Sequence, residues 1–277
     1  MRMILILGLV FNTSLGATEI DSFTLRDPQM RDSLEELDGI IQSYFDKALK
    51  QANQAHSCNA SFFEKILYNL FKGFFWTQFE VDIETSNTLD RRNIERSNSI
   101  YRDLNFFETM ALFMADLGYV MKIGNFYVGS DKLGHFLETG YDYYRSHSLQ
   151  EALGFGELTE RTYFGFNTTG VYSYGDLAAN LDGYEFWTRV TGGKQPYFSC
   201  KNNTWKQSRP FSWSDYVNAA WDEGLNCNYF ADDHITAAVS KRIEDLGMKC
   251  PVEPGHCPSM LQRYGVLAAH VVMPSCF

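Results

Sequence analysis

The segment Gly129–Tyr144 (GSDKLGHFLETGYDYY) gathers the side chains of this sequence that are best suited to acid–base or metal chemistry. Its polar members recur at i, i+4, i+7 and i+11, a spacing that places them on one face of a helix. They are Asp131, His135, Glu138 and Asp142. The same spacing also suits the solvated face of an ordinary amphipathic helix, whose buried face would carry Leu133, Phe136 and Leu137.

Two kinds of chemistry fit this segment. Glu138 can act as a single general acid, because a carboxyl group whose pKa is raised by aromatic neighbours can protonate a glycosidic oxygen. Those neighbours would be Phe136, Tyr141 and Tyr144. Alternatively, Asp131, His135 and Glu138 bind a divalent metal, with Asp232–His234 as the best second half of the site. Because a single helix carries the pattern, we favour the general acid and expect no metal and no other cofactor.

A second cluster, rich in hydroxyl groups and tyrosines, follows between residues 168 and 176. Small hydroxyls, tyrosine rings and flanking glycines offer hydrogen bonds and stacking surfaces to a sugar. The candidate substrate-binding residues here are Thr169, Tyr172, Ser173, Tyr174 and Asp176. Tyr216 and Tyr229 are candidates for the opposite wall of a cleft. Alternatively, residues 168–176 form an ordinary hairpin whose tyrosines cover the core, and Tyr216 and Tyr229 simply pack a helix.

Other catalytic motifs are missing from the sequence. It contains no G-x-S-x-G nucleophile elbow, no Walker loop and no G-x-G-x-x-G fingerprint. The formal net charge of −10 also disfavours binding to phosphate backbones, so we expect no nucleic-acid partner.

The apolar periodicity predicts a mainly α protein with a small β-hairpin or ribbon over residues 161–174. Ser130 or Asp131 would cap the helix that carries Glu138, and Asp176 would cap a later helix. Gly134 and Gly140 each cost a helix about 1 kcal/mol relative to Ala, which indicates close approach of another chain or of a ligand. The predicted helices span residues 32–55, 61–79, 105–121, 132–147, 176–189, 213–223 and 234–246, with a polar excursion at 82–103 and a turn at 125–130.

The first 17 residues resemble a secretory signal peptide, with Arg2 before a short apolar run and a small-residue cleavage site. We therefore expect a secreted or periplasmic protein without a stable membrane anchor. Residues 18–277 would form a single, monomeric domain whose Cys/Pro-rich tail covers residues 247–277. Six cysteines, all after the leader, predict up to three disulfides, some of which hold the tail, with the pairing left open.

Two stretches resemble a family of exported lysozymes from predatory bacteria (bdellovibrios) that cleave deacetylated peptidoglycan. They are Asp131–Glu138 (DKLGHFLE) and Thr169–Asp176 (TGVYSYGD), and the likeness covers roughly residues 60–240. The resemblance implies a lysozyme-like helical fold with a β-ribbon along the cleft, and Glu138 as the catalytic glutamate. It further implies that a tyrosine replaces the second carboxylate, for which Tyr229 is the first candidate and Tyr216 the second.

The expected function is thus an exported glycosidase that cleaves the glycan strands of peptidoglycan. Loss of Arg2 with the leader changes the net charge from −10 to −11, which favours a partly cationic, deacetylated glycan as partner. The alternatives are a metal-dependent hydrolase and a non-catalytic glycan-binding protein of the cell envelope.

Overall fold

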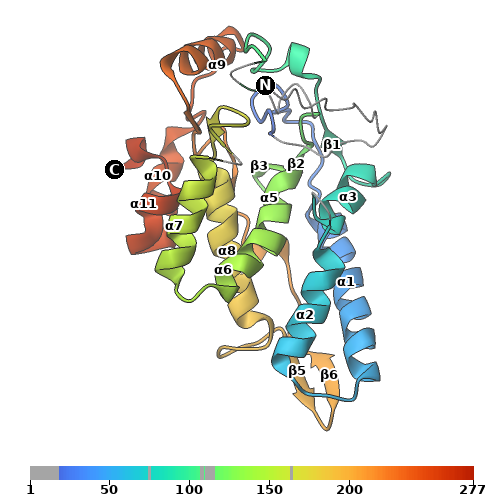
Figure 1. Cartoon of the computed structure of the whole chain (residues 1–277). Coiled ribbons are helices and arrows are strands. Elements are labelled where there is room, and N and C mark those ends of the chain that lie inside the picture. Colours follow the sequence, from blue (N-terminus) through green and yellow to red (C-terminus); the bar gives the residue numbers. More distant parts are fainter. Residues whose placement is uncertain (1–18, 74–75, 107–108, 110–115, 163–164) are drawn as a thin grey trace, which may run out of the picture.

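Helices make up most of the computed structural model, which describes residues 19–73, 76–106, 109, 116–162 and 165–277 (Figure 1). The α-helices are α1 (Leu34–Gln54), α2 (Ala60–Phe71), α3 (Gln78–Thr85), α5 (Ser130–Gly134), α6 (Gly140–Arg145), α7 (Leu149–Glu160), α8 (Tyr174–Val190), α9 (Asp233–Asp245), α10 (Cys257–Tyr264) and α11 (Ala268–Val271). The strands are β1 (Arg91–Arg92), β2 (Val120–Ile123), β3 (Phe126–Gly129), β4 (Val171–Tyr172), β5 (Phe198–Lys201), β6 (Thr204–Gln207) and β7 (Tyr229–Phe230). All strand pairs within the three small sheets, β1-β2-β3, β4-β7 and β5-β6, are antiparallel. The mainly α prediction is therefore confirmed.

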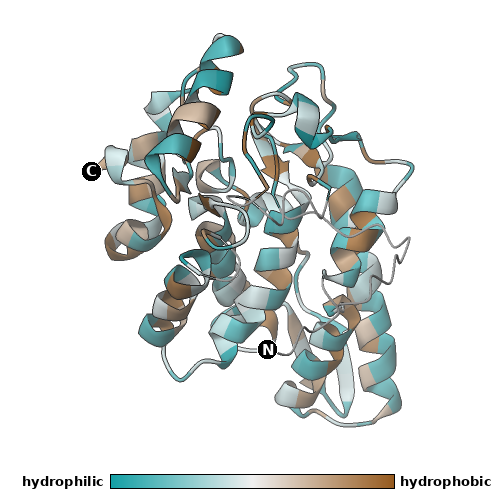
Figure 2. Cartoon of the chain, turned by 45° about the horizontal axis from the view of Figure 1, so that its top comes forward, coloured by the Kyte–Doolittle hydropathy of each residue, from teal (hydrophilic) through white to brown (hydrophobic). Residues whose placement is uncertain are grey.

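The centre of the fold is one unbroken helical path from Ser130 to Arg145. It consists of α5, the π-helical segment η2 (His135–Thr139) and α6. Its apolar side chains Leu133, Phe136 and Leu137 are fully buried, as their spacing predicts. Around the path, the other helices also turn apolar residues inward and polar residues outward (Figure 2).

Glycines let this central path approach its neighbours closely. A Cβ on Gly140 would lie 2.6 Å from the Cα of Gly183 in α8, and a Cβ on Gly134 would lie 2.1 Å from a carboxylate oxygen of Glu80 in α3. The expected close approach is thus confirmed, but in both cases the neighbour is another part of the same chain rather than another chain or a ligand.

Two helix predictions in the first half of the chain differ from the structure, one of them only over the residues that the structure describes. The predicted helix 61–79 is split into α2 and α3, because the chain turns tightly at Gly73, where a Cβ would lie 1.5 Å from the Trp76 carbonyl oxygen. Thr77 then starts α3 with a capping box to Glu80. Of the predicted helix 105–121, residues 107–108 and 110–115 lie outside the described residues; none of its described residues is helical, and the last two belong to β2.

The predicted turn at 125–130 is instead mostly strand β3, which pairs with β2 around Gly124. The central helix begins directly after it at Ser130, and its N-cap is Gly129 rather than Ser130 or Asp131.

In the described part of the predicted ribbon 161–174, which lacks residues 163–164, the strand pairs with a distant segment rather than within the ribbon. Val171 and Tyr172 form β4, which pairs with Phe230 and Tyr229 of the distant strand β7. The following helix α8 is capped by Ser173, whose hydroxyl accepts a hydrogen bond from the Asp176 backbone N–H, so the predicted cap at Asp176 is also wrong. Residues 213–223 form only the short 3₁₀ turns η3 (Trp213–Asp215) and η4 (Ala219–Trp221), whereas the helix predicted at 234–246 is confirmed as α9.

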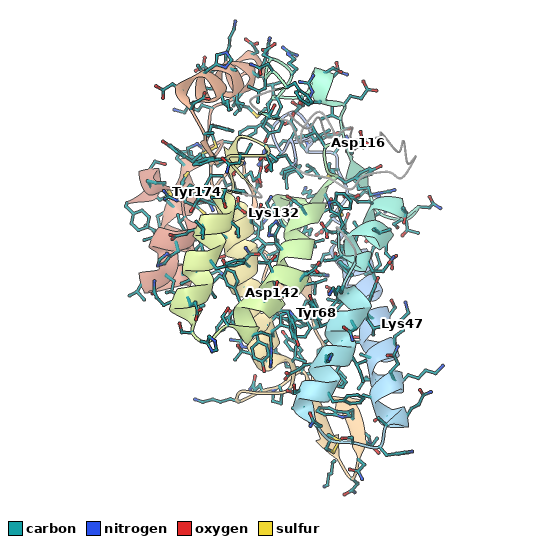
Figure 3. All side chains as sticks on the ribbon, viewed as in Figure 1. Lys47, Tyr68, Asp116, Lys132, Asp142 and Tyr174 are labelled. Carbon is teal, nitrogen blue, oxygen red and sulfur yellow. A yellow bond between two sulfur atoms is a disulfide. The ribbon has the colours of Figure 1, made fainter. Side chains whose placement is uncertain are left out.

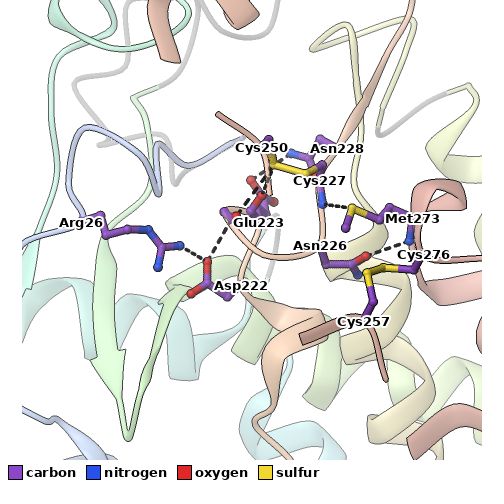
Figure 4. Close-up of a disulfide and its surroundings, with 11 residues drawn as sticks. Arg26, Asp222, Glu223, Asn226, Cys227, Asn228, Cys250, Cys257, Met273 and Cys276 are labelled. Carbon is purple, nitrogen blue, oxygen red and sulfur yellow. Dashed lines mark hydrogen bonds and ion pairs between the residues drawn. A yellow bond between two sulfur atoms is a disulfide. The ribbon is translucent and has the colours of Figure 1, made fainter. Parts of the chain in front are cut away.

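Three disulfides join all six cysteines, as the even cysteine count predicts. The pairs are Cys58–Cys200, Cys227–Cys250 and Cys257–Cys276. Cys227–Cys250 links the C-terminal tail to the body, whereas Cys257–Cys276 joins two points within the tail. Figure 4 shows both disulfides beside Asn226 and Met273, whose contacts also bind the tail to the body. The tail is more regular than its composition suggests, because it forms α10 and α11, which lie beside α7 (Figure 1) and bury Met260, Tyr264 and Val271 in the core.

These disulfides indicate folding in an oxidising compartment outside the cytoplasm. Within the described part of the chain, no helix has both the length and the apolar character required to cross a membrane. The proposed signal peptide at residues 1–17 lies outside the described residues.

Candidate active site

Glu138 lies on the exposed side of η2, where the central helical path faces α2. Glu64, Tyr68 and Lys72 follow one another at i, i+4 and i+8 along α2 and its C-cap, so they share the face that meets Glu138. On the opposite side, η2 carries Glu138, and α6 carries Tyr141, Asp142 and Tyr144. We call these seven residues the α2–α6 seam.

Glu138 is half-buried and hydrogen-bonded to the Tyr68 hydroxyl. Burial raises the pKa of the Glu138 carboxyl above its ordinary value, and the nearby Asp142 carboxylate raises it further. Lys72 and the hydrogen bond from Tyr68 act in the opposite direction, but the pKa of Glu138 remains raised. A carboxyl group in this state can hold a proton closer to neutral pH and donate it.

Three tyrosines form a row beside this carboxyl group. The rings of Tyr68 and Tyr141 stack with centroids 4.1 Å apart, and the Tyr144 ring follows 6.2 Å from Tyr141. The ring of buried Trp187 packs against Tyr141, with the ring centroids 4.7 Å apart. Buried Glu64 accepts a hydrogen bond of 3.2 Å from the Tyr144 hydroxyl. All three tyrosines are only half-buried, so each keeps some surface exposed to solvent. Figure 3 shows Tyr68 on α2 next to Asp142 on α6.

A second polar cluster surrounds Lys132 at the other end of the same helical path. The side chain of Lys132 is fully buried, and its Nζ lies 2.7 Å from Asp131, 2.6 Å from Asp176 and 2.6 Å from Glu223. Each ammonium proton thus has a carboxylate partner, which holds the pKa of Lys132 well above its ordinary value although burial alone would lower it. We call Lys132 and these three carboxylates the Lys132 cluster.

Two more buried carboxyl groups lie next to the Lys132 cluster. Burial raises the pKa of Glu19 and of Glu160 well above the ordinary value, and the carboxylates of the cluster add to both shifts. Their protonation limits the negative charge that accumulates around the single ammonium.

His135 connects the two regions. Its Nε2 lies 3.3 Å from Asp176 in the Lys132 cluster, and its Nδ1 lies 3.1 Å from the Asn180 amide oxygen. Glu138 follows one turn later on the helix, where His135 has an electrostatic effect on its carboxyl group.

The metal alternative finds no support in this geometry. Asp131 faces Lys132, His135 faces Asp176 and Glu138 faces Tyr68, so these three side chains do not converge on one ion. The only group of carboxylates in the described residues close enough to share an ion is Asp131, Asp176 and Glu223. The ammonium of Lys132 already lies between their oxygens. The proposed second half-site also has another role, because Asp232 caps α9.

The structure buries most of the predicted substrate-binding residues. Thr169, Tyr172, Ser173, Asp176 and Tyr216 are each at most 8% exposed, and only Tyr174 is partly open. Ser173 hydrogen-bonds Glu223, Asp176 belongs to the Lys132 cluster, and the Tyr216 hydroxyl lies 2.9 Å from that of Tyr197. Side chains with such internal contacts cannot contact a glycan unless the core opens.

Tyr229 is exposed, but it is not the tyrosine next to Glu138. It lies on β7, where its ring packs 5.9 Å from Phe166 and borders a cavity of about 220 Å³ beside the Cys227–Cys250 disulfide. The hydrogen-bond partner of Glu138 is Tyr68. The second tyrosine candidate, Tyr216, is buried in the aromatic core.

Sequence reasoning missed Tyr68 and Lys72, and it did not connect Lys132 with Glu223. For the first pair a signal existed, since Glu64, Tyr68 and Lys72 interrupt a very apolar helix at four-residue intervals. No local signal connects Lys132 with Glu223, because 91 positions separate them in the sequence.

The fold and this site define a mainly helical, disulfide-linked protein with a half-buried carboxyl group in a tyrosine-lined seam. No protein-family model matches the sequence, and it matches neither a curated protein nor a solved structure. The functional argument therefore depends on the chemistry of the site.

Proposed function

We propose that this protein is an exported glycosidase of the lysozyme type, with Glu138 as its general acid. The observation that carries the proposal is the state of Glu138, a half-buried carboxyl group with a raised pKa that borders partly open tyrosine rings. Tyrosine faces stack on sugar rings, and a protonated carboxyl group can protonate a glycosidic oxygen.

In the proposed reaction, the proton of Glu138 passes to the glycosidic oxygen while the bond from this oxygen to C1 breaks. Positive charge develops on the sugar, and either water or the sugar's own 6-hydroxyl group then attacks C1. The proton released by the attacking hydroxyl returns to a base. Asp142, one helical turn from Glu138 and more exposed, is a better candidate for this second role than Tyr229, which lies next to another cavity.

The proposed substrate is the glycan strand of peptidoglycan, preferably deacetylated. Removal of acetyl groups leaves amines that are partly cationic, and a chain with a net charge of −10 attracts them. We place the protein in the periplasm or outside the cell, as a monomer, in line with its three disulfides.

The decisive experiment incubates the purified protein with native and with deacetylated sacculi and identifies the released fragments by mass spectrometry. We expect Glu138→Gln to lower turnover by about 10²–10⁴-fold, the usual contribution of a general acid. Glu151→Gln, on the exposed first turn of α7, is the matched control and should leave turnover unchanged. Asp142→Asn tests the second carboxyl group in the same assay.

Three other results would lead to different conclusions. Full activity of Glu138→Gln would refute its role as general acid. Retention of the wild type on sacculi without any released fragment would favour a glycan-binding protein. Activity that a chelator removes and an added divalent ion restores would favour the metal alternative.

A further inference from the structure

Lys72 is the cation at one end of the α2–α6 seam. It is the C-cap residue of α2 and is exposed to solvent, and its Nζ lies 5.9 Å from the centre of the Tyr68 ring. Tyr68 in turn hydrogen-bonds Glu138 and stacks on Tyr141. A ligand that covers the Tyr68–Tyr141 stack next to Glu138 therefore comes within reach of this ammonium.

The electrostatic surroundings of Lys72 make its position unusual. It lowers the pKa of both Glu138 and Asp142, and thus opposes the proton retention that the proposed reaction requires. No ion pair of Lys72 with a carboxylate is formed within the part of the chain that the structure describes, so its ammonium can accept an anionic partner from a ligand. An anion bound there would screen Glu138 from Lys72.

We propose that Lys72 binds a carboxylate on the substrate sugar next to the scissile bond, and that it thereby selects acidic glycans over neutral ones of the same backbone. This inference rests on the proposed function, because it assigns the substrate to the same seam. The overall negative charge of the protein attracts amines along the strand, whereas Lys72 recognises one carboxylate near the point of cleavage.

The binding of this carboxylate also affects the reacting proton. Once the bound carboxylate neutralises Lys72, the lowering effect of Lys72 is lost, so the pKa of Glu138, which burial and Asp142 already raise, rises further in the complex. The other titratable groups that act on Glu138 are Tyr68 from α2 and His135 from its own helix. An acidic substrate should therefore stay reactive to higher pH than a neutral one, and Lys72→Gln should abolish this difference.

Binding measurements test the inference without turnover. Two probes of equal length are titrated into Glu138→Gln, namely a neutral N-acetylglucosamine oligomer and an oligomer whose muramic acid residues carry free lactyl carboxylates. We expect a second substitution, Lys72→Gln, to weaken binding of the acidic oligomer about fivefold, the size of a partly exposed ion pair, and to leave the neutral one unchanged. Lys72→Arg should restore the preference, and high salt should remove it.

Lys65→Gln, a neighbouring exposed lysine on α2, is the matched control and should change neither affinity. Equal losses for both oligomers, no loss for either, or no measurable binding of the acidic oligomer would each overturn the assignment of Lys72. The proposed function fails independently, if the wild type releases no fragments or if Glu138→Gln retains full turnover.

Discussion

Replacing Lys132 by Met should destabilise the fold strongly, and by an amount that depends on pH. The methionine side chain matches lysine in length but leaves three buried carboxylates, Asp131, Asp176 and Glu223, without the ammonium that lies 2.6–2.7 Å from each. Breaking a buried ion pair by removing one partner costs about 3–5 kcal/mol, and here one cation serves three partners. We therefore expect the free energy of unfolding to fall by at least about 3 kcal/mol at pH 8.

The sign of the pH dependence follows from proton linkage. Without Lys132, the folded-state pKa values of these carboxyls rise above those of the unfolded chain, which are about 4. Such groups bind more protons when folded, so stability decreases as the pH rises from the unfolded towards the folded pKa values. The variant should therefore be nearest to the wild type near pH 4 and furthest from it at pH 8.

Urea unfolding with intact disulfides, followed by tryptophan fluorescence at pH 5 and pH 8, measures both effects, since Trp187, Trp213 and Trp221 are buried. Lys65→Met, which changes an exposed lysine, should be nearly neutral. Adding Asp131→Asn and Glu223→Gln to Lys132→Met should recover part of the loss. A loss below about 1 kcal/mol, within the range of surface ion pairs, or the same loss at both pH values would refute the reasoning.

Two further predictions concern stability. Burial raises the pKa of Glu80 to about 8, so the wild type should lose stability as the pH rises from about 4.5 to 8. In urea unfolding at several pH values, Glu80→Gln should make the stability depend less on pH. An unchanged pH dependence would contradict the assignment. Cys58–Cys200 closes a loop with a sequence separation of 142, against 19 for Cys257–Cys276. Chain entropy assigns about 5 and about 3 kcal/mol to the two, so replacing the first pair by serines should lower the thermal midpoint more, and the opposite order would argue against an entropic origin.

Local patterns were sufficient to predict much of the fold. The apolar spacing in α1 and α9, the buried face of Leu133, Phe136 and Leu137, and the even number of cysteines all give correct expectations, because each depends on near neighbours or on composition. Tight turns were harder to recognise. The break after Phe71 follows from a backbone contact at Gly73, and apolar periodicity does not register such a contact.

The site was predictable only in part. Glu138 stands out by sequence, and its raised pKa agrees with the expected acid, but its tyrosine partner comes from α2, which packs against it only in three dimensions. The composition of the hydroxyl-rich segment at 168–176 predicted a sugar-binding surface. Composition alone, however, does not tell whether such a segment faces solvent or the interior. The burial of Ser173 and Asp176 follows from contacts that are distant in the sequence: Asp176 pairs with Lys132, 44 positions away, and Ser173 hydrogen-bonds Glu223.

The π-helical turn at His135–Thr139 has a consequence for how this protein can vary. A π turn holds one residue more than an α-helical turn, and each residue corresponds to a rotation of about 100° around the helix axis. The extra residue therefore sets the rotation of the second half of this helical path, which carries the seam residues, relative to the first half, which carries Lys132. Point substitutions in either half leave this rotation unchanged. The insertion or deletion of one residue between Lys132 and Glu138 would instead rotate Glu138 by about 100° relative to the Lys132 cluster, and thus away from Tyr68, even though both residues are retained.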